Sequence, residues 1–179
     1  MLTIVFEAHS TTTDNNAKLA SGFNDVALSP LGLRQSKELG ERYSNETFDA
    51  IFCSDLQRSY ITAEIAFDNK YPIIHDSRLR ECDYGDMTLR PKEIVDAQKP
   101  QYIAVPFPNG ESYEQSTERI RCFLVDLLRN YQGKRVMIIG HRATQYGLEH
   151  LIKKIPLHQT VIAPWKWQPG WEYLLKVMS

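Results

Sequence analysis

The chain has 179 residues, of which 42% are hydrophobic and 24% are charged, a composition typical of a folded globular protein. It carries 21 Lys and Arg against 22 Asp and Glu and no basic run, which argues against a nucleic-acid partner. The apolar start over residues 2–6 is interrupted by Glu7 and is too short for a signal peptide or a membrane span. Three widely spaced cysteines do not indicate a disulfide framework, so we expect a cytoplasmic protein without a membrane partner.

Strand and helix patterns alternate along the first half of the chain. Ser29 followed by Pro30 indicates a helix start, with a capping hydroxyl and then proline at the first helical position. Ser54 or Asp55 is predicted to cap the next helix. The predicted elements are a strand at 2–6, a helix at 30–43, a strand at 48–53, a helix at 56–67 and an extended segment at 71–75.

The second half continues this alternation. Apolar residues between positions 113 and 131 recur at intervals of three and four, which predicts a long amphipathic helix. The predicted elements are an irregular polar stretch at 76–91, a loop at 106–110, a helix at 113–131, a strand at 135–139, a helix at 143–152 and two late strands, one near Val161 and one at 172–177. Alternation of this kind predicts an α/β fold, a three-layer αβα sandwich with a mostly parallel central sheet.

Chemically active side chains follow three of the predicted strands. Open parallel sheets bind ligands beyond the carboxyl ends of their strands. His9 follows the first strand, Arg58 follows the second, and His141 follows the strand at 135–139. Helix N-termini near Asp55 and Arg142 are predicted to direct free backbone N–H groups at the same edge. Two imidazoles, a guanidinium and helix ends together predict an anion site suited to phosphate.

The motifs resemble those of the histidine phosphatase superfamily, which is related to the cofactor-dependent phosphoglycerate mutases. That family begins with a strand and Arg-His-Gly, with an Asn six positions after the His. Here His9 is followed by Ser10, and Asn15 stands at that spacing. Further family segments occur in the same order: Gly22 to Gly32 with Gln35-Ser36, Ser54 to Arg58 with Thr62-Ala63-Glu64, Leu79 to Gly85, Pro108 to Ser112, and Gly140-His141. Each motif is weak alone, but six in register over nearly the whole chain are specific.

This resemblance implies a single histidine phosphatase-like domain over residues 1–179, with the phosphoglycerate mutase-like fold. It implies a phosphatase that hydrolyses a small phosphomonoester through a phosphohistidine on His9, with no metal or cofactor. Glu81 would protonate the leaving oxygen and then deprotonate the incoming water. The groups implied to hold the phosphoryl oxygens or the substrate are Arg58, His141, Ser10, Asn15, Arg142 and Arg80.

The expected partner is therefore a small phosphorylated substrate or inorganic phosphate. A mutase is disfavoured, because mutases of this family are longer and carry extra segments around the site. The sequence does not indicate which phosphomonoester is used, and it allows an oligomer without indicating one.

The chain departs from the family pattern next to the nucleophile. Ala8 stands where the family has arginine, and Ser10 stands where it has glycine. Loss of one preorganised oxyanion donor typically lowers the rate by about 10²–10³. We hypothesise that Arg142, directly after the second histidine, supplies the missing guanidinium. In the alternative, Glu7 pairs with Arg142, and the protein binds a phosphorylated ligand but is catalytically impaired.

Structural roles are open for several of these residues. Arg80 is either a phosphate ligand or a partner in a salt bridge, and Asn15 could instead cap a turn. Large aromatic residues near the end of the chain are predicted to pack rather than to line a substrate pocket; they are Trp165, Trp167 and Trp171.

Cys53 and Arg58 are similar to the nucleophile and arginine of cysteine phosphatases. Their spacing is five positions rather than six, and the intervening loop lacks the glycines that let backbone N–H groups surround a phosphate. Cys53 also ends an apolar strand, where a cysteine usually packs as a small hydrophobe. We therefore reject a cysteine nucleophile.

Overall fold

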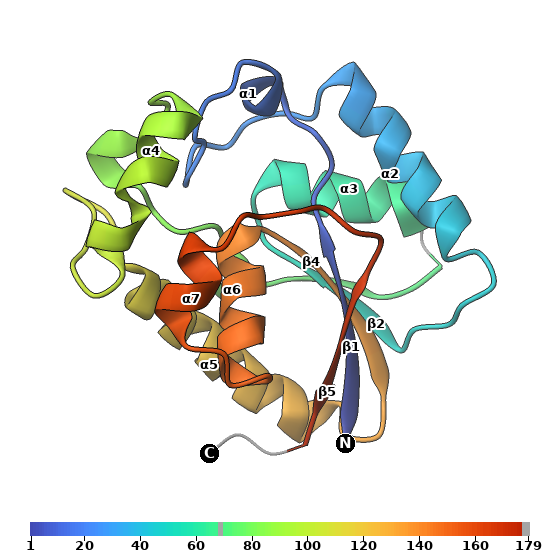
Figure 1. The fold of residues 1–179 in the computed structure, drawn as a ribbon. Coiled ribbons are helices and arrows are strands. Elements are labelled where there is room, and N and C mark those ends of the chain that lie inside the picture. Colours follow the sequence, from blue (N-terminus) through green and yellow to red (C-terminus); the bar gives the residue numbers. More distant parts are fainter. Residues whose placement is uncertain (68–69, 177–179) are drawn as a thin grey trace.

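A five-stranded sheet forms the centre of the computed structural model, which describes residues 1–67 and 70–176 (Figure 1). Its strands are β1 (Leu2–Ala8), β2 (Ala50–Cys53), β3 (Ile73–His75), β4 (Arg135–Gly140) and β5 (Trp171–Leu175). The strand order is β3-β2-β4-β1-β5. The pairs β1–β4, β2–β4 and β2–β3 are parallel, and β5 runs antiparallel to β1. The predicted α/β fold with a mostly parallel sheet is confirmed.

Helices cover both faces of this sheet, with α2 and α3 on one face and α5 and α6 on the other (Figure 1). The helices are α1 (Thr13–Asn16), α2 (Pro30–Arg42), α3 (Gln57–Phe67), α4 (Lys92–Gln98), α5 (Tyr113–Asn130), α6 (Arg142–Leu151) and α7 (Leu157–Ile162). Three short 3-10 turns, η1 (Ser77–Leu79), η2 (Gly85–Met87) and η3 (Lys99–Tyr102), join the middle elements. No helix within the described ranges is long and apolar enough to cross a bilayer.

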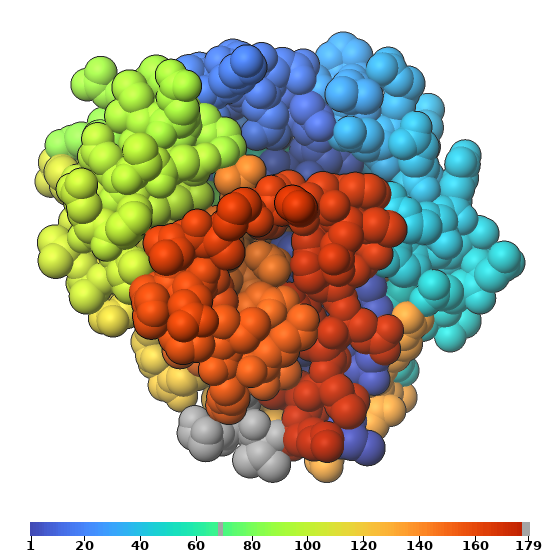
Figure 2. Space-filling model, in the orientation of Figure 1, coloured from blue at the N-terminus to red at the C-terminus, as the bar shows by residue number. Residues whose placement is uncertain are grey.

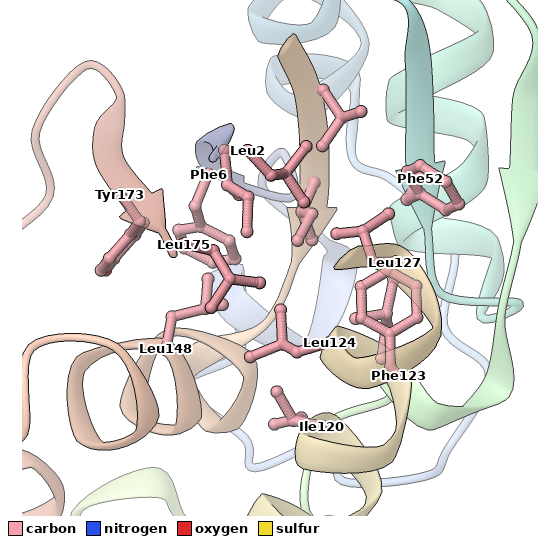
Figure 3. Close-up of a cluster of buried hydrophobic side chains, with 14 of the residues drawn as sticks. Leu2, Phe6, Phe52, Ile120, Phe123, Leu124, Leu127, Leu148, Tyr173 and Leu175 are labelled. Carbon is pink, nitrogen blue, oxygen red and sulfur yellow. The ribbon is translucent and has the colours of Figure 1, made fainter. Parts of the chain in front are cut away.

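Alternation along the strands gives two hydrophobic clusters, one on each face of the sheet, and a third cluster includes residues of α4, α6 and α7. Leu2, Ile4 and Phe6 of β1 pack in the cluster that contains α5 and α6 (Figure 3), whereas Val5 packs with α2 and α3. Successive strand residues point to opposite faces, so β1, β2 and β4 each contribute to both clusters, whereas β5 contributes only to the cluster with α5 and α6. A sheet with both faces covered by helices leaves its strand ends as the open edge where polar residues can gather.

The start of α2 also fixes the loop that follows the first strand. Ser29 caps the helix by accepting a hydrogen bond from the Gly32 amide at 3.1 Å, and Pro30 is the first helical residue, as predicted. A Cβ atom on Gly32 would lie 2.0 Å from the Thr11 carbonyl oxygen. Glycine at this position therefore lets α2 lie directly against the segment that follows His9.

The predicted caps of α3 are wrong. The helix begins at Gln57, and the Gln57 amide donates to Asp25 Oδ1 at 2.8 Å. Ser54 Oγ instead contacts His141, and the Asp55 carboxylate binds Arg80. The helix end near Asp55 is thus capped by a carboxylate from a distant loop and does not offer this N–H group to an anion.

The predicted strand near Val161 is also wrong, because Leu157–Ile162 is helix α7. The β-branched residues around Val161 favoured a strand. The buried residues Leu157, Thr160 and Val161 nevertheless follow helical spacing after Pro156. The last strand is confirmed as β5, and the part of that prediction at position 177 lies outside the described residues.

Candidate active site

With the exception of Arg80, the residues predicted to bind phosphate line one pocket of about 570 Å³. It lies beyond the carboxyl ends of β1 and β4 and is lined by the segment after β1, by α2, α4 and the start of α6, and by residues before β5. Figure 2 shows atoms of α4 (green), of the N-terminal segment (blue) and of the segment before β5 (red) around a hollow on this face. The sheet edge expected from the strand order is therefore a concave site.

His9 and His141 are neighbours in this pocket, with ring centroids 5.0 Å apart. The His9 amide donates to the Gly140 carbonyl at 3.0 Å, which holds the two strand ends together. His9 Nδ1 lies 2.8 Å from the Ser10 carbonyl oxygen. Because a carbonyl only accepts, Nδ1 carries the hydrogen and Nε2 keeps its lone pair. Burial, together with the Arg58 charge, lowers the pKa of His9 to about 3, so the ring is neutral at pH 7.

His141 follows β4 and precedes the first residue of α6. Its side chain is almost fully buried, with Nε2 at 2.7 Å from Ser54 Oγ. Burial and the positive charge of Arg58 lower its pKa well below the ordinary value, so this imidazole is also neutral. Its Nδ1 is buried and has no hydrogen-bond partner among the described residues.

Arg58 is a buried cation held by backbone carbonyls. Its two terminal nitrogens donate to Asn24 O at 2.8 Å and to Gly22 O at 2.7 Å, and the residue is 2% exposed. Within the part of the chain that the structure describes, no carboxylate lies within ion-pair distance of it. Burial lowers the pKa of Arg58, although nearby Glu81 opposes this. A buried charge without a counter-ion is costly, so this guanidinium is suited to bind an anion.

Among the described residues, Glu81 is one of four acidic residues that line the pocket, with Glu7, Glu38 and Asp96. Its Oε1 accepts from the amides of Cys82 at 2.8 Å and Ala143 at 3.1 Å, while no described donor contacts Oε2. The carboxyl group is thus fixed by one oxygen and can exchange a proton through the other. We refer to His9, Arg58, Glu81 and His141 as the central cluster.

Ser10 and Asn15 also line the pocket. The Ser10 amide donates to Thr62 Oγ1 at 3.1 Å, and its hydroxyl lies 2.9 Å from Ser36 Oγ. Asn15 Oδ1 accepts from the Thr12 amide at 3.0 Å as part of the cap of α1. Asn15 therefore combines the capping role and the pocket position that the sequence left as alternatives.

The structure does not bring Arg80 into the pocket. Its guanidinium makes a two-pronged contact with the Asp55 carboxylate, at 2.7 and 2.6 Å, and it does not line the cavity. Of the two predicted roles, the salt bridge is the one that the structure shows.

Arg142 does line the pocket, and its charge contributes to the low pKa of His9. The predicted alternative in which Glu7 pairs with Arg142 is wrong. Glu7 Oε1 instead accepts from Arg42 Nη1 at 2.8 Å and from the Tyr43 hydroxyl at 2.7 Å. The partner of Arg142 is Asp96, 3.6 Å from its Nη1.

Several residues that line the pocket were not predicted from the sequence. Asp96 contacts Lys92 and lies 2.7 Å from Lys99 Nζ, in addition to its contact with Arg142. The spacing of Lys92 and Asp96 is a helical i,i+4 pair that could have indicated α4. No sequence signal links Arg42 to Glu7, because 35 positions separate them. We call these groups the ion-paired set: Glu7 with Arg42, and Asp96 with Lys92, Lys99 and Arg142.

The three tryptophans have different roles. Trp171 is buried in β5 and packs edge-on against Phe6, with the two ring centroids 5.5 Å apart. The packing prediction is therefore confirmed for Trp171. Trp165 also packs against the core, with its ring centroid 6.0 Å from that of Trp171, and in addition it lines the pocket. Trp167 lines the pocket. The Arg142 guanidinium lies 4.8 Å from the Trp165 ring, and the Arg42 guanidinium lies 5.4 Å from the Trp167 ring. The two arginines of the ion-paired set are therefore packed on aromatic faces.

Rejection of a cysteine nucleophile is supported by the environment of Cys53. Its side chain is fully buried in the cluster with α2 and α3, and burial raises the pKa of this thiol to about 12. A thiol with such a pKa is not a thiolate at neutral pH. Across residues 1–67 and 70–176, no group of three or more histidine, cysteine, aspartate or glutamate side chains is arranged to hold a metal ion.

The chain is similar in sequence to a known protein family and to several of its members. Residues 4–163 match the family model described as the histidine phosphatase superfamily (branch 1). The uncharacterized phosphatase PhoE of Bacillus subtilis is 32% identical over 151 residues, which cover 83% of this chain and 76% of that protein. Phosphoserine phosphatase 1 of Hydrogenobacter thermophilus is 28% identical over 150 residues, covering 79% of this chain and 71% of that protein.

Solved structures share the fold. YhfR of Bacillus stearothermophilus matches with a TM-score of 0.83 at 24% identity, covering 96% of this chain and 90% of that one. A mycobacterial glucosyl-3-phosphoglycerate phosphatase, solved in complex with VO3, matches with a TM-score of 0.79 at 22% identity. The match covers 90% of this chain and 85% of that chain. At these identities the structural likeness establishes the architecture of the sheet and its helices.

Proposed function

The chain belongs to the histidine phosphatase superfamily, branch 1, and we propose that it hydrolyses a small phosphomonoester through a phosphohistidine on His9. The observation that carries this proposal is the central cluster. A buried Arg58 without a counter-ion stands in one pocket with two neutral imidazoles and an acid. An incoming phosphoryl dianion supplies the charge that Arg58 lacks and an acceptor for the unpartnered His141 Nδ1.

Each half-reaction uses a group already oriented by the fold. His9 Nε2 attacks phosphorus, the bond to the leaving oxygen breaks, and Glu81 gives that oxygen a proton. The Ser10 carbonyl then stabilises the positive charge of the phosphorylated ring through Nδ1–H. Water attacks phosphorus next, Glu81 takes its proton, and the N–P bond electrons return to Nε2. Arg58 and His141 bind the equatorial oxygens, where transition-state charge develops.

The position of Arg142 supports its role as a substitute for the family arginine, which is Ala8 in this chain. It lines the pocket and lies close enough to His9 to lower its pKa. We propose that its guanidinium contacts the bound phosphoryl group. No metal or cofactor is assigned a step, because chain residues supply the nucleophile, the acid and the cations.

One observation favours a second candidate function. Arg142 is attracted to Asp96, which competes with a phosphoryl group for its guanidinium. With Ala8 beside the nucleophile, a protein that binds a phosphorylated ligand but turns it over slowly would have the same pocket. This phospholigand-binding protein is the alternative to be tested.

Hydrolysis of p-nitrophenyl phosphate and of phosphoserine by the purified protein, with a metal chelator present, separates the two candidates. Phosphoserine is included because Phosphoserine phosphatase 1 is among the relatives. The proposed enzyme hydrolyses at least one of them, loses activity in His9→Ala, and retains it in His158→Ala, a matched change of an exposed histidine outside the pocket. Rapid acid-free quenching is expected to trap phosphate on His9.

The alternative gives a different pattern. Absence of turnover, together with protection of the fold against heat by inorganic phosphate, supports a binding protein. Absence of both turnover and protection contradicts both candidates. We also propose a cytoplasmic location, which three cysteines free of disulfides support.

A further inference from the structure

Ser54 contacts the second histidine from outside the pocket. The residue is fully buried at the end of β2, and its Oγ lies 2.7 Å from His141 Nε2. Ser54 is not among the residues that line the cavity, whereas His141 is. Any influence of this hydroxyl on a bound ligand therefore passes through the imidazole.

The hydrogen bonds around Ser54 determine the direction of this contact. A serine hydroxyl has one hydrogen and two lone pairs. The Leu56 amide donates toward Ser54 Oγ at 3.4 Å and so uses a lone pair. Among the described residues, no carbonyl or carboxylate accepts from this hydroxyl. The arrangement that gives its hydrogen an acceptor has Ser54 O–H donating to His141 Nε2.

This direction fixes the remaining nitrogen of the ring. A neutral imidazole that accepts at Nε2 carries its hydrogen on Nδ1. Nδ1 of His141 is buried and unpartnered within the described part of the chain. A buried donor without an acceptor is unfavourable, and an oxygen of a ligand in the pocket is the acceptor that would satisfy it.

We propose that Ser54 is a positioning residue that holds His141 in the Nδ1–H form, so that the ring presents a neutral hydrogen-bond donor to the phosphoryl group. This inference rests on the proposed phosphatase function. It also explains how two adjacent imidazoles serve different purposes. In His9 the Nδ1–H is bound to the Ser10 carbonyl and Nε2 is free to attack, whereas in His141 Nε2 is bound and Nδ1–H is free to donate.

Nitrogen NMR of the full-length protein labelled with ¹⁵N-histidine tests the assignment directly, because the two ring nitrogens have different shifts with and without hydrogen. His141 of the wild type is expected to show hydrogen on Nδ1. Ser54→Ala is expected to give a mixture in which Nε2 also carries hydrogen, and Ser54→Thr, which keeps the hydroxyl, to restore the wild-type pattern. Ser116→Ala removes another buried hydroxyl, one bonded only within α5, and is the matched control.

Kinetics supply the second measurement. Ser54→Ala is expected to lower kcat by about tenfold to hundredfold with a smaller change in KM, as for the loss of an outer group that orients an inner one. Ser54→Thr is expected to recover most of this loss, and Ser116→Ala to match the wild type.

A wild-type spectrum with hydrogen on Nε2 of His141 overturns the proposal, as does a Ser54→Ala protein with unchanged tautomer and kcat. The wild-type spectrum decides the tautomer even where a variant does not fold. Failure of the wild type to hydrolyse any ester or to bind inorganic phosphate, with Nδ1–H intact, contradicts the proposed function but supports the assignment to Ser54.

Discussion

The central cluster holds its charged and polar groups by backbone carbonyls, backbone amides and a hydroxyl, whereas the ion-paired set neutralises its cations with carboxylates. Arg58 donates to two carbonyls and has no ion pair among the described residues. Arg42 is bound to Glu7, and Asp96 is shared by Lys92, Lys99 and Arg142. Carbonyls orient a guanidinium without cancelling its charge, so the central cluster keeps its attraction for a dianion. Carboxylates cancel much of the charge in the other group.

The comparison predicts that the two groups respond differently to the same substitution. Arg58→Lys is expected to lower kcat/KM by about 10³ or more, because a point-charge ammonium cannot bridge two carbonyls and still bind a phosphoryl oxygen. Arg42→Lys keeps a single-contact pair with Glu7 and is expected to change kcat/KM less than about fivefold. Steady-state assays with one aryl phosphate measure both. Equal losses would show that the distinction between the two groups has no functional meaning.

Arg142 belongs to the ion-paired set but is proposed to serve the phosphoryl group. Arg142→Ala is expected to lower kcat by about 10²-fold, the typical loss for one oxyanion donor. Ala8→Arg, which restores the family arginine, is expected to recover much of the activity in the Arg142→Ala background and to add little in the wild type. An Arg142→Ala protein with unchanged kcat and phosphate affinity contradicts the replacement hypothesis.

The buried imidazoles predict a pH dependence of stability. The folded chain keeps His9 and His141 neutral, because burial lowers both pKa values, whereas the unfolded chain binds protons below about pH 6.5. The free energy of unfolding is therefore expected to fall by about 1 kcal/mol per histidine between pH 6 and pH 5. Urea denaturation of the wild type and of a His9→Asn, His141→Asn double variant tests this. Parallel pH profiles for the two proteins would contradict it.

The smallest effect is expected for Trp167, one of the two tryptophans that line the pocket. Trp167 is 55% exposed and stacks with Arg42 beside the pocket. Trp167→Ala is expected to raise KM two- to fivefold (about 0.4–1 kcal/mol, within the range for an exposed cation–π contact) and to leave kcat unchanged. Trp171→Ala is the contrasting change: it is expected to lower Tm, because Trp171 is buried in the core. A large loss of kcat in Trp167→Ala would contradict this prediction, because it would show that Trp167 contributes to the chemical step.

Local patterns in the sequence were sufficient for most elements of the fold. Ser29 and Pro30 mark the start of α2, and the spacing of apolar residues marks α5. Prediction was wrong where the deciding group lies elsewhere in the chain. The cap of α3 comes from Asp25, and α7 buries Leu157, Thr160 and Val161 in helical register despite their β-branched neighbours. In α7, tertiary packing outweighs β-propensity, and in α3 a hydrogen bond from a distant residue replaces the local cap.

Three of the four residues of the central cluster were predictable because of their positions relative to the strands. His9, Arg58 and His141 each follow a strand, and parallel strands bring their carboxyl ends to one edge. Topology thus converts position along the chain into proximity in space. Arg80 follows no strand directly, and its pairing with Asp55 rather than with a ligand could not be predicted from its loop.

The amino-acid sequence alone indicated most strands and helices in their order along the chain, the family motifs and the residues that we propose as nucleophile, acid and cations. Tertiary structure alone decided the partners of those groups: Glu7 with Arg42, Arg142 with Asp96, and His141 with Ser54. Hydrophobic periodicity is a local property that a sequence displays directly. Hydrogen bonds and ion pairs act over a few ångströms, so they depend on which distant residues the finished fold brings together.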